Sequence, residues 1–241
     1  MLSLSQFSRQ ITEAVLVLVC KRPAPGIGKQ RLAARLGNEL ACAIAQALLV
    51  CALEDACSWP GPVVVAPADA ADADWAKNLI DPIRLRFPLT IMPQTQGNLG
   101  QRLNALDRTL RAHGRKQLVF IGSDAPGLDA IDYQAALAAL QHTDVALISA
   151  SDGGVVLMAS RCAWPELSML PWSSGRLGKS LLDACESAGQ SVSAMRQGRD
   201  VDEVADLIEL PAALKHDLRP ARRLLRELIL ENLIVIQTAH A

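Results

Sequence analysis

The chain has 241 residues, half of them hydrophobic, and a formal net charge of −1. This length suits one large domain or two small ones, and the apolar content is ample for a core. The near-neutral charge argues against a general nucleic-acid binder, which usually has a strongly basic face. An aromatic content of 3% also argues against stacking platforms for single-stranded nucleic acid.

Neither a membrane span nor a disulfide framework is expected. No apolar run approaches the ~20 residues that cross a bilayer, and the first residues lack the basic start and apolar core of a signal peptide. The six cysteines form no C-x-x-C pair and mostly lie among Ala, Leu and Val, which indicates buried, reduced thiols. The four histidines lack metal-ligand spacing. We therefore expect a soluble, cytoplasmic protein without a zinc site.

Short β-type runs alternate with helical patterns along the chain. The predicted strands are 14–20, 61–67, 89–94, 117–122, 144–150, 154–160 and 191–196. The predicted helices are 38–57, 70–79, 100–113, 129–141, 175–189 and 202–209. Continuous apolar strands between amphipathic helices indicate a sheet covered on both faces, a three-layer α/β/α sandwich. The strands around "SDGG" are too close for a helical crossover, so the mostly parallel sheet should be mixed.

The chain shows no internal repeat, low-complexity segment or linker, and one domain spanning residues 1–241 is expected. Its tail, "DLRPARRLLRELILENLIVIQTAHA", is Arg-rich and amphipathic, which predicts a helix at about 217–237. Such a helix could lie on a membrane surface or a partner. We favour packing of its apolar stripe on its own domain or on a second subunit, so a homodimer is left open.

The first candidate site is the stretch "CKRPAPGIGKQRLA", at the seam between the first strand and the segment that follows. Its prolines shape a loop, and Gly26 and Gly28 permit unusual backbone angles and close approach of a ligand. Four basic residues surround the entry to a helix, where free N–H groups favour anions: Lys21, Arg22, Lys29 and Arg31. The pattern suits a phosphate chain but lacks the spacing of a Walker loop. A solvated basic turn explains this stretch equally well.

The second candidate site is "FIGSDAPGLD", where an apolar strand ends in Ser123 and Asp124. A carboxylate at the carboxyl end of a strand faces the ligand crevice of an open α/β sheet. Oxygen ligands of this kind suit Mg²⁺ or Mn²⁺ held jointly with phosphates. The structural alternative is an Asp that caps the next helix, and Asp129 is the better candidate for that role.

Two further acidic segments follow in the second half of the chain. In "SDGGVV", Asp152 precedes two glycines that allow close approach of a ligand, although an ordinary Asp-Gly hairpin turn competes with this reading. In "GRDVDEVADL", Asp200 and Asp202 alternate around Val201, so both carboxylates project on one side if the segment is extended. Capping of the next helix by Asp202 is the alternative there.

In this order, the segments resemble the GT-A-type nucleotide-diphospho-sugar transferase superfamily. Within it, the chain is most similar to bacterial glycosyltransferase-like proteins related to phospholactate guanylyltransferase and molybdenum-cofactor guanylyltransferase. Those proteins typically carry A-K-x-P-x-P-G-x-x-K-T-R-L, G-D-L-G-x-R, G-S-D-x-P, E-D-G-G-Y, W-S-T and D-V-D-T. The counterparts here are "CKRPAPGIGKQRL", "GNLGQR", "GSDAP", "SDGGV", "WSS" and "RDVDE", and the match runs from about Val15 to Leu207.

The resemblance implies a nucleotide held over the first half of a mixed sheet. It implies that Asp124 is the main metal-binding and catalytic carboxylate, and that Asp200 or Asp202 completes a site for Mg²⁺ or Mn²⁺. Asp152, the second catalytic candidate, would act with Gly153 and Gly154 on the acceptor or sugar side. The implied nucleotide-binding residues are Lys21, Arg22, Gly26, Gly28, Lys29, Arg31, Asn98, Gly100, Arg102 and Ser123, with Lys29 and Arg31 on the phosphates.

Three positions depart from the pattern: Gln30 replaces Thr, Ser151 replaces Glu, and Val155 replaces Tyr. The phosphate and metal ends are kept, while the acceptor side loses an acid and an aromatic. We expect a metal-dependent, glycosyltransferase-like enzyme that binds a nucleoside diphosphate sugar. The alternatives are nucleotidylyl transfer from an NTP to a phosphorylated acceptor and a catalytically silent nucleotide-binding protein. Either transfer needs charge neutralisation at a leaving phosphate, by a divalent ion and Lys or Arg.

Overall fold

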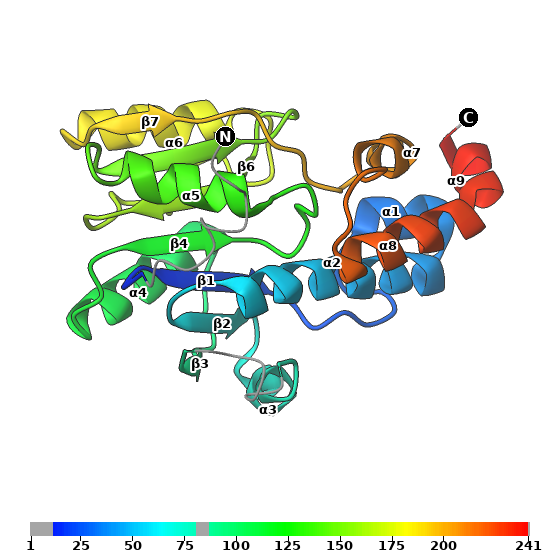
Figure 1. Ribbon diagram of the computed structural model, residues 1–241, viewed down its shortest axis with the longest axis horizontal. Coiled ribbons are helices and arrows are strands. Elements are labelled where there is room, and N and C mark those ends of the chain that lie inside the picture. The colour runs from blue at the N-terminus through cyan, green and yellow to red at the C-terminus, as the bar shows by residue number, and fades with distance from the viewer. Residues whose placement is uncertain (1–11, 81–86, 241) are drawn as a thin grey trace, which may run out of the picture.

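The computed structural model describes residues 12–80 and 87–240. Their centre is a seven-stranded sheet with the order β3-β2-β1-β4-β6-β5-β7 (Figure 1). The strands are β1 (Val15–Cys20), β2 (Val63–Pro67), β3 (Leu89–Ile91), β4 (Leu118–Ile121), β5 (Val145–Ser149), β6 (Val155–Ser160) and β7 (Val192–Ala194). β6 runs antiparallel to both its neighbours, and the other pairs are parallel. The prediction of a mixed, mostly parallel sheet is confirmed, and each predicted strand is present.

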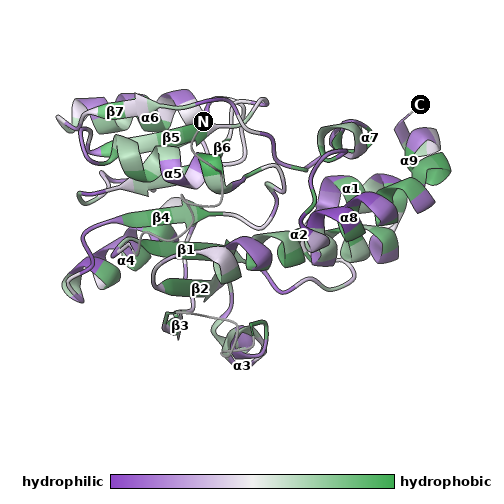
Figure 2. Ribbon diagram, viewed as in Figure 1, coloured by the Kyte–Doolittle hydropathy of each residue, from purple (hydrophilic) through white to green (hydrophobic). Residues whose placement is uncertain are grey.

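Helices cover both faces of the sheet. They are α1 (Gln30–Leu36), α2 (Asn38–Ser58), the 3-10 turn η2 (Ala70–Asp72), α3 (Ala73–Lys77), α4 (Leu99–Ala112), α5 (Ala130–Ala139), α6 (Leu177–Ser187), α7 (Val204–Ala213), α8 (Pro220–Glu231) and α9 (Leu233–His240). Alternate residues of β1 point to opposite faces, so Leu16 and Leu18 pack with α2, α3 and α5, while Val15 and Val17 pack with α4 and α6. The central strands β1, β2 and β4 are accordingly hydrophobic (Figure 2). The predicted three-layer sandwich is confirmed.

A third hydrophobic cluster lies beyond the carboxyl ends of the parallel strands. α2 is about 31 Å long at 1.5 Å per residue, so it extends past the sheet. There it packs with α1 and α8, which gather with α7 and α9 at the right of Figure 1. Leu32 and Ile44 meet Leu207, Leu225 and Ile236 in this cluster. The cluster therefore forms one wall beside the edge of the sheet where ligands bind in open α/β folds.

The C-terminal segment forms two helices instead of the single helix expected at about 217–237. α8 ends before Asn232, whose side chain donates to the carbonyl of Leu228 at 2.9 Å, and α9 starts one residue later. The break lets α9 turn onto α7 and α1, where Arg35 donates to the carbonyl of Ala239 at 2.7 Å. The apolar stripe packs on the same chain, as favoured from the sequence. The homodimer stays a prediction.

The expectation that no apolar run approaches the length of a membrane span needs correction at α2. By length and composition alone, this helix passes the test for a span, and no other helix of the described residues does. Its apolarity has a structural explanation in this fold. One side of α2 packs on β1, and another contacts α1 and α8, so both sides contribute buried residues to the cores.

Several cysteines behave as small hydrophobic core residues, as expected. Cys20, Cys51 and Cys185 are buried. Burial raises the pKa of each of these three thiols to about 12, so each is held protonated and unreactive at neutral pH. The cytoplasmic location stays a prediction.

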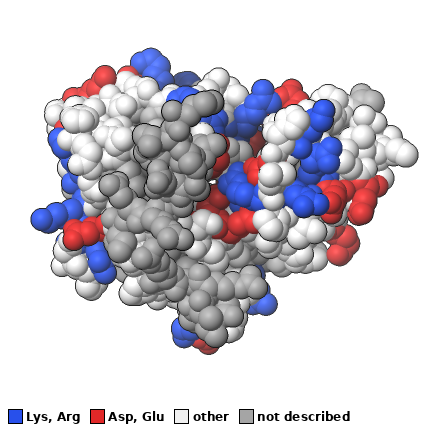
Figure 3. All heavy atoms as spheres, viewed as in Figure 1, with Lys and Arg blue, Asp and Glu red and all other residues white. Residues whose placement is uncertain are grey.

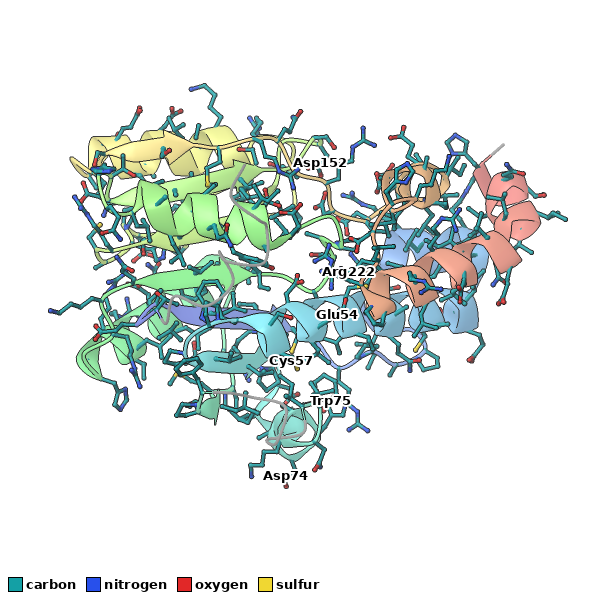
Figure 4. All side chains as sticks on the ribbon, viewed as in Figure 1. Glu54, Cys57, Asp74, Trp75, Asp152 and Arg222 are labelled. Carbon is teal, nitrogen blue, oxygen red and sulfur yellow. The ribbon has the colours of Figure 1, made fainter. Side chains whose placement is uncertain are left out.

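A buried ion-pair network ties α8 to α2 and to the loop after β4. Arg222 is fully buried and donates to Asp55 at 2.7 Å, to Glu54 at 2.9 Å and to the carbonyls of Cys51 and Pro126. Arg222 and Glu54 lie together where α8 crosses α2 (Figure 4). Around these helices, basic and acidic side chains are interspersed on the face that Figure 3 shows. The network fixes the position of the loop that carries Asp124.

A second arginine, at the N-cap of α8, extends this network. Arg219 donates to Asp55 at 3.0 Å and to the carbonyl of Leu128 at 2.8 Å. The hydroxyl of Tyr133, on α5, also donates to Asp55, at 2.9 Å. One carboxylate of α2 therefore accepts from three side chains, which join α5 and the second half of the 122–129 loop to the helical wall.

Candidate functional site

A cleft of about 750 Å³ lies at the edge of the sheet where β1 and β4 end and β6 begins. Its walls come from the loop after β1, the start of α4, the loop after β4, the turn before β6 and the 172–177 segment. Most of the predicted site residues line it: Lys21, Arg22, Gly28, Lys29, Arg31, Asn98, Arg102, Ser123, Asp124, Asp152, Gly154, Asp200 and Asp202. Residues far apart in the chain are thus brought to one place, as the motif order predicted.

Three glycines that were expected to face the ligand do not line this cleft. A Cβ on Gly100 would lie 2.1 Å from the carbonyl oxygen of Leu167, so this glycine lets α4 pack against that segment. Gly153 has φ +89, and its Cβ would lie 1.9 Å from the carbonyl oxygen of Gly175. Gly26 has φ +77 and belongs to the loop itself. In the structure these glycines serve packing and turn geometry. The ligand-side roles predicted for them stay predictions.

The loop after β1 is held in a conformation that points Lys29 into the cleft. Gly28 has φ +72, and Lys29, which precedes α1, follows it in the left-handed region with φ 45. The side chain of Gln30 donates to the carbonyl of Gly26 at 2.7 Å and closes the loop. Gln30 in place of Thr therefore has a structural role in this chain.

Lys29 lies at the centre of the predicted metal site. Its ammonium donates to Asp124 Oδ2 at 3.0 Å, to Asp202 Oδ1 at 2.7 Å and to the carbonyl of Val201 at 2.6 Å. Burial by itself would lower the pKa of Lys29, but the two carboxylates outweigh it and raise the pKa above its usual value. Lys29 is a permanent cation here, and it contacts carboxylates where a phosphate contact was predicted.

Two more carboxylates face the same place. Burial first, and then the charges of three neighbouring carboxylates, raise the pKa of Asp200 to about 7; the three are Asp152, Asp124 and Asp202. Asp152 lies at the cleft edge of the sheet (Figure 4) and accepts from the N–H of Gly154 at 2.8 Å. One ammonium for four carboxylates leaves the site with an excess of negative charge.

The donors at this site suit a divalent cation, but their present arrangement encloses an ammonium. Asp124, Asp202 and the carbonyl of Val201 offer the oxygen ligands that Mg²⁺ and Mn²⁺ take. Within residues 12–80 and 87–240, no three Asp, Glu, His or Cys side chains are grouped as a metal site. The ligand types suit a divalent ion, but in the positions they hold here they enclose the Lys29 ammonium. Metal binding by Asp124, Asp200 or Asp202 stays a prediction.

The other basic residues of the cleft are more accessible than Lys29. Arg31 makes an exposed ion pair with Glu203 at 3.3 Å, and Arg22 lies 3.5 Å from Asp72 and over the ring of Trp75. Exposed pairs of this kind are worth at most about 1 kcal/mol, so a phosphate can replace their carboxylates at little cost. Lys21 is exposed and lines the cleft.

The structure also decides between several of the alternatives at the acidic positions. Asp129 caps α5, since its carboxylate accepts from the N–H groups of Ile131 and Asp132 at 2.8 and 3.1 Å, as predicted. The residue that caps α7 is Glu203, so the carboxylate of Asp202 is left for Lys29. Asp152 forms a turn, and its carboxylate still lines the cleft. The turn at Asp152 is therefore confirmed, and the functional role of its carboxylate stays a prediction.

The cleft contains residues that the sequence-based list of site residues left out. Trp172 lines it and donates from its indole N–H to the carbonyl of Leu167 at 2.8 Å. Gln94, three residues after the end of β3, is buried and also lines the cleft. Its side-chain amide donates to the carbonyl of Ala66 at 2.7 Å. The "WSS" match pointed to Trp172, but the polar Gln94 carried no motif.

Comparisons with known proteins place the chain in a family. Residues 49–174, more than half of the chain, match the family DUF2064, described as an uncharacterized protein conserved in bacteria. The chain belongs to this family. No curated protein matched the DUF2064 chain.

Several solved structures are similar to this DUF2064 protein. The crystal structure of a proposed nucleotide-diphospho-sugar transferase from Desulfovibrio desulfuricans G20 has a TM-score of 0.83 and 24% identity, and the match covers 95% of this chain and 99% of that one. The bifunctional IspDF from Campylobacter jejuni has a TM-score of 0.50 and 14% identity, over 81% of this chain and 53% of that one. CMP:2-keto-3-deoxy-manno-octonic acid synthetase complexed with CTP has a TM-score of 0.49 and 16% identity, over 86% and 100%. The first similarity confirms the predicted nucleotide-diphospho-sugar transferase-like fold.

Proposed function

We propose that this DUF2064 protein is a metal-dependent transferase that binds a nucleoside diphosphate sugar in the 750 Å³ cleft. One observation carries the proposal: Lys29, Asp124 and Asp202 converge at the carboxyl edge of the sheet beside exposed basic residues. Cations and carboxylates in one cleft suit a ligand that combines phosphates with a divalent ion. The structural relative from Desulfovibrio desulfuricans G20, itself a proposed nucleotide-diphospho-sugar transferase, has the same fold.

Each group of residues has a part in the proposed reaction. Lys21, Arg22 and Arg31 bind and orient the diphosphate, since all three line the cleft and are accessible. Asp124 and Asp202 would hold Mg²⁺ or Mn²⁺, which neutralises charge on a leaving phosphate when bound. Asp152 stands on the acceptor side of the cleft. No covalent bond to the protein is required, because positioning and charge neutralisation accomplish the transfer.

The test is a thermal-shift panel of NTPs and nucleoside diphosphate sugars, with Mg²⁺, Mn²⁺ or chelator. A cognate nucleotide at a hundredfold excess over its dissociation constant stabilises the folded state by about 2.7 kcal/mol. The matched variant changes both Lys21 and Arg31 to Ala, which removes two accessible cations from the cleft. It should lose the shift with nucleotides, while a shift with the bare nucleoside should change little. The proposal fails if no nucleotide shifts the melt under any metal condition.

Two alternatives use the same cleft. A nucleotidylyltransferase would release pyrophosphate from an NTP, whereas a glycosyltransferase would release a nucleoside diphosphate, so product analysis separates them. A catalytically silent binder is favoured by Ser151 and Val155: Ser151 lines a separate cavity of about 580 Å³, and Val155 offers the main cleft only an aliphatic side chain. Binding without turnover across a broad acceptor set would support the silent protein.

A further inference from the structure

The ammonium of Lys29 has the surroundings of a bound cation. It lies within 3.0 Å of three oxygens from two segments of the chain, and only 13% of the side chain is exposed. The same oxygens are those that would hold a divalent ion under the proposed function, on which this inference rests. We propose that Lys29 is a tethered competitor of the metal ion, which closes the metal site until it is displaced.

Geometry makes the two cations mutually exclusive. Mg²⁺ binds its oxygen ligands at about 2.0–2.1 Å. An ion that bonds Asp124 Oδ2 and Asp202 Oδ1 together must lie between them, where the ammonium now donates at 3.0 and 2.7 Å. Two like charges at that separation also repel strongly. The ion therefore enters only when the ammonium leaves.

The loop that carries Lys29 has room to move. A Cβ built on Gly26 or Gly28 meets no atom within 4 Å, so there is open space on that side of both glycines. Lys29 itself has φ 45, a left-handed conformation that an L-residue with a long side chain rarely adopts. A change of backbone angles in this glycine-flanked turn releases that conformation and withdraws the ammonium from the carboxylates.

The displaced ammonium finds its new partner in the same cleft. Lys21 and Arg31 line it with Lys29, and phosphates bound to them would accept from the freed ammonium. The metal ion takes the place of the Lys29 ammonium between the carboxylates, and the phosphate accepts hydrogen bonds from the displaced ammonium. Each ligand therefore raises the affinity of the other. Metal alone binds weakly, because no phosphate is then present to accept hydrogen bonds from the displaced ammonium.

The experiment measures Mn²⁺ binding from the signal of free Mn²⁺ in electron paramagnetic resonance, with no nucleotide present. Lys29→Met and Lys29→Asn both remove the ammonium, and Asn in addition tolerates a left-handed backbone. Each variant should bind Mn²⁺ at least about tenfold more tightly than the wild type, because a charge-assisted hydrogen bond is worth that factor or more. Lys21→Met is the control: it removes the same charge from the same cleft, and should change Mn²⁺ affinity by less than about threefold, since exposed charges are screened.

Three further measurements complete the test. Asp124→Asn added to Lys29→Asn should abolish the gain, which locates the ion at the carboxylates that Lys29 vacated. Inorganic pyrophosphate should raise Mn²⁺ affinity more in the wild type than in Lys29→Asn. If either variant needs an ion to fold, Mn²⁺ should restore its melting transition, and failure to restore it counts against the proposal.

The competition is overturned if both Lys29 variants bind Mn²⁺ no more tightly than the wild type, or if Lys21→Met gains as much. Failure of the proposed function looks different. In that case no nucleotide shifts the melt, but the gain in Mn²⁺ affinity of the Lys29 variants still appears.

Discussion

Removal of the Arg222 guanidinium should destabilise the protein more than any change at an exposed arginine. Arg222 is 0% exposed, and its donors meet two carboxylates and two main-chain carbonyls of α2 and the loop after β4. Arg222→Met keeps most of the length and volume of the side chain but deletes the charge. Asp55 and Glu54 then lose a buried partner, and the carbonyl of Pro126 loses a donor.

The expected cost follows from that environment. Removal of one partner of a buried ion pair costs about 3–5 kcal/mol, because the remaining charge is buried without compensation. In a chain of this length, 1 kcal/mol shifts the melting temperature by about 2–4 °C, so a fall of about 6–20 °C is expected. Asp55 keeps Arg219 and Tyr133 as donors, which favours the lower half of this range.

The assay is urea or thermal unfolding followed by circular dichroism. Arg223→Met is the matched control, since Arg223 is the next residue of α8 and is exposed; its cost should stay within about 0.5 kcal/mol. Asp55→Asn combined with Arg222→Met should cost less than the sum of the single changes, with a coupling of about 0.5–3 kcal/mol. If Arg222→Met lies within about 1 kcal/mol of the wild type, the network does not stabilise the fold and the argument is wrong.

Three other predictions concern the cleft and the turn beside it. The Asp200 carboxyl keeps its proton up to about pH 7 in the folded protein but only to about pH 3.9 in the unfolded chain. The wild type therefore loses stability as pH rises from about 4 to 7. In urea melts, the free energy of unfolding of Asp200→Asn minus that of the wild type should grow over this range and then level off. A difference that does not change with pH would contradict the raised pKa. Gly153→Ala should lower the melting temperature, because its Cβ would lie 1.9 Å from the carbonyl oxygen of Gly175, which is backbone, whereas Gly114→Ala, with φ +80 but open space, should cost only the backbone strain of about 1 kcal/mol. In the Lys21→Ala, Arg31→Ala double variant, affinity for a cognate nucleotide should fall by about a hundredfold or more, since each of two charged hydrogen bonds to phosphate is worth about 1.5–3 kcal/mol. Titration calorimetry would measure the loss, and equal losses for nucleotide and nucleoside would mean that these residues hold the loop.

Local patterns were enough to predict most of the fold. Continuous apolar runs mark strands that are buried on both faces, and the interruptions between them were long enough for helices except at "SDGG". That exception correctly predicted the antiparallel pairing of β5 and β6. The order of the basic loop and the acidic segments likewise predicted one site at the carboxyl edge of the sheet, because strand ends of a parallel sheet meet there.

Other features depended on contacts between distant parts of the chain. Position along the sequence does not reveal that β6 also pairs with β4, or that α9 turns away from α8 to pack on α1 and α7. Gly100 and Gly153 read as ligand-facing glycines, yet the space beside each is taken by the main chain of another segment. A glycine motif shows that backbone passes close by, but not whether the close neighbour is a ligand or the protein itself.

Lys29 shows most clearly which features the sequence predicts and which depend on the tertiary structure. The sequence by itself determined that a basic loop and two carboxylates would meet, since each follows a strand of one sheet. Only the tertiary structure decided which groups pair: Lys29 bonds Asp124 and Asp202, which are 95 and 173 residues away in the chain. Side-chain pairing depends on ångström distances and on burial, which strengthens an ion pair that water would otherwise weaken. Such distances arise when the whole chain packs, and a local pattern does not contain them.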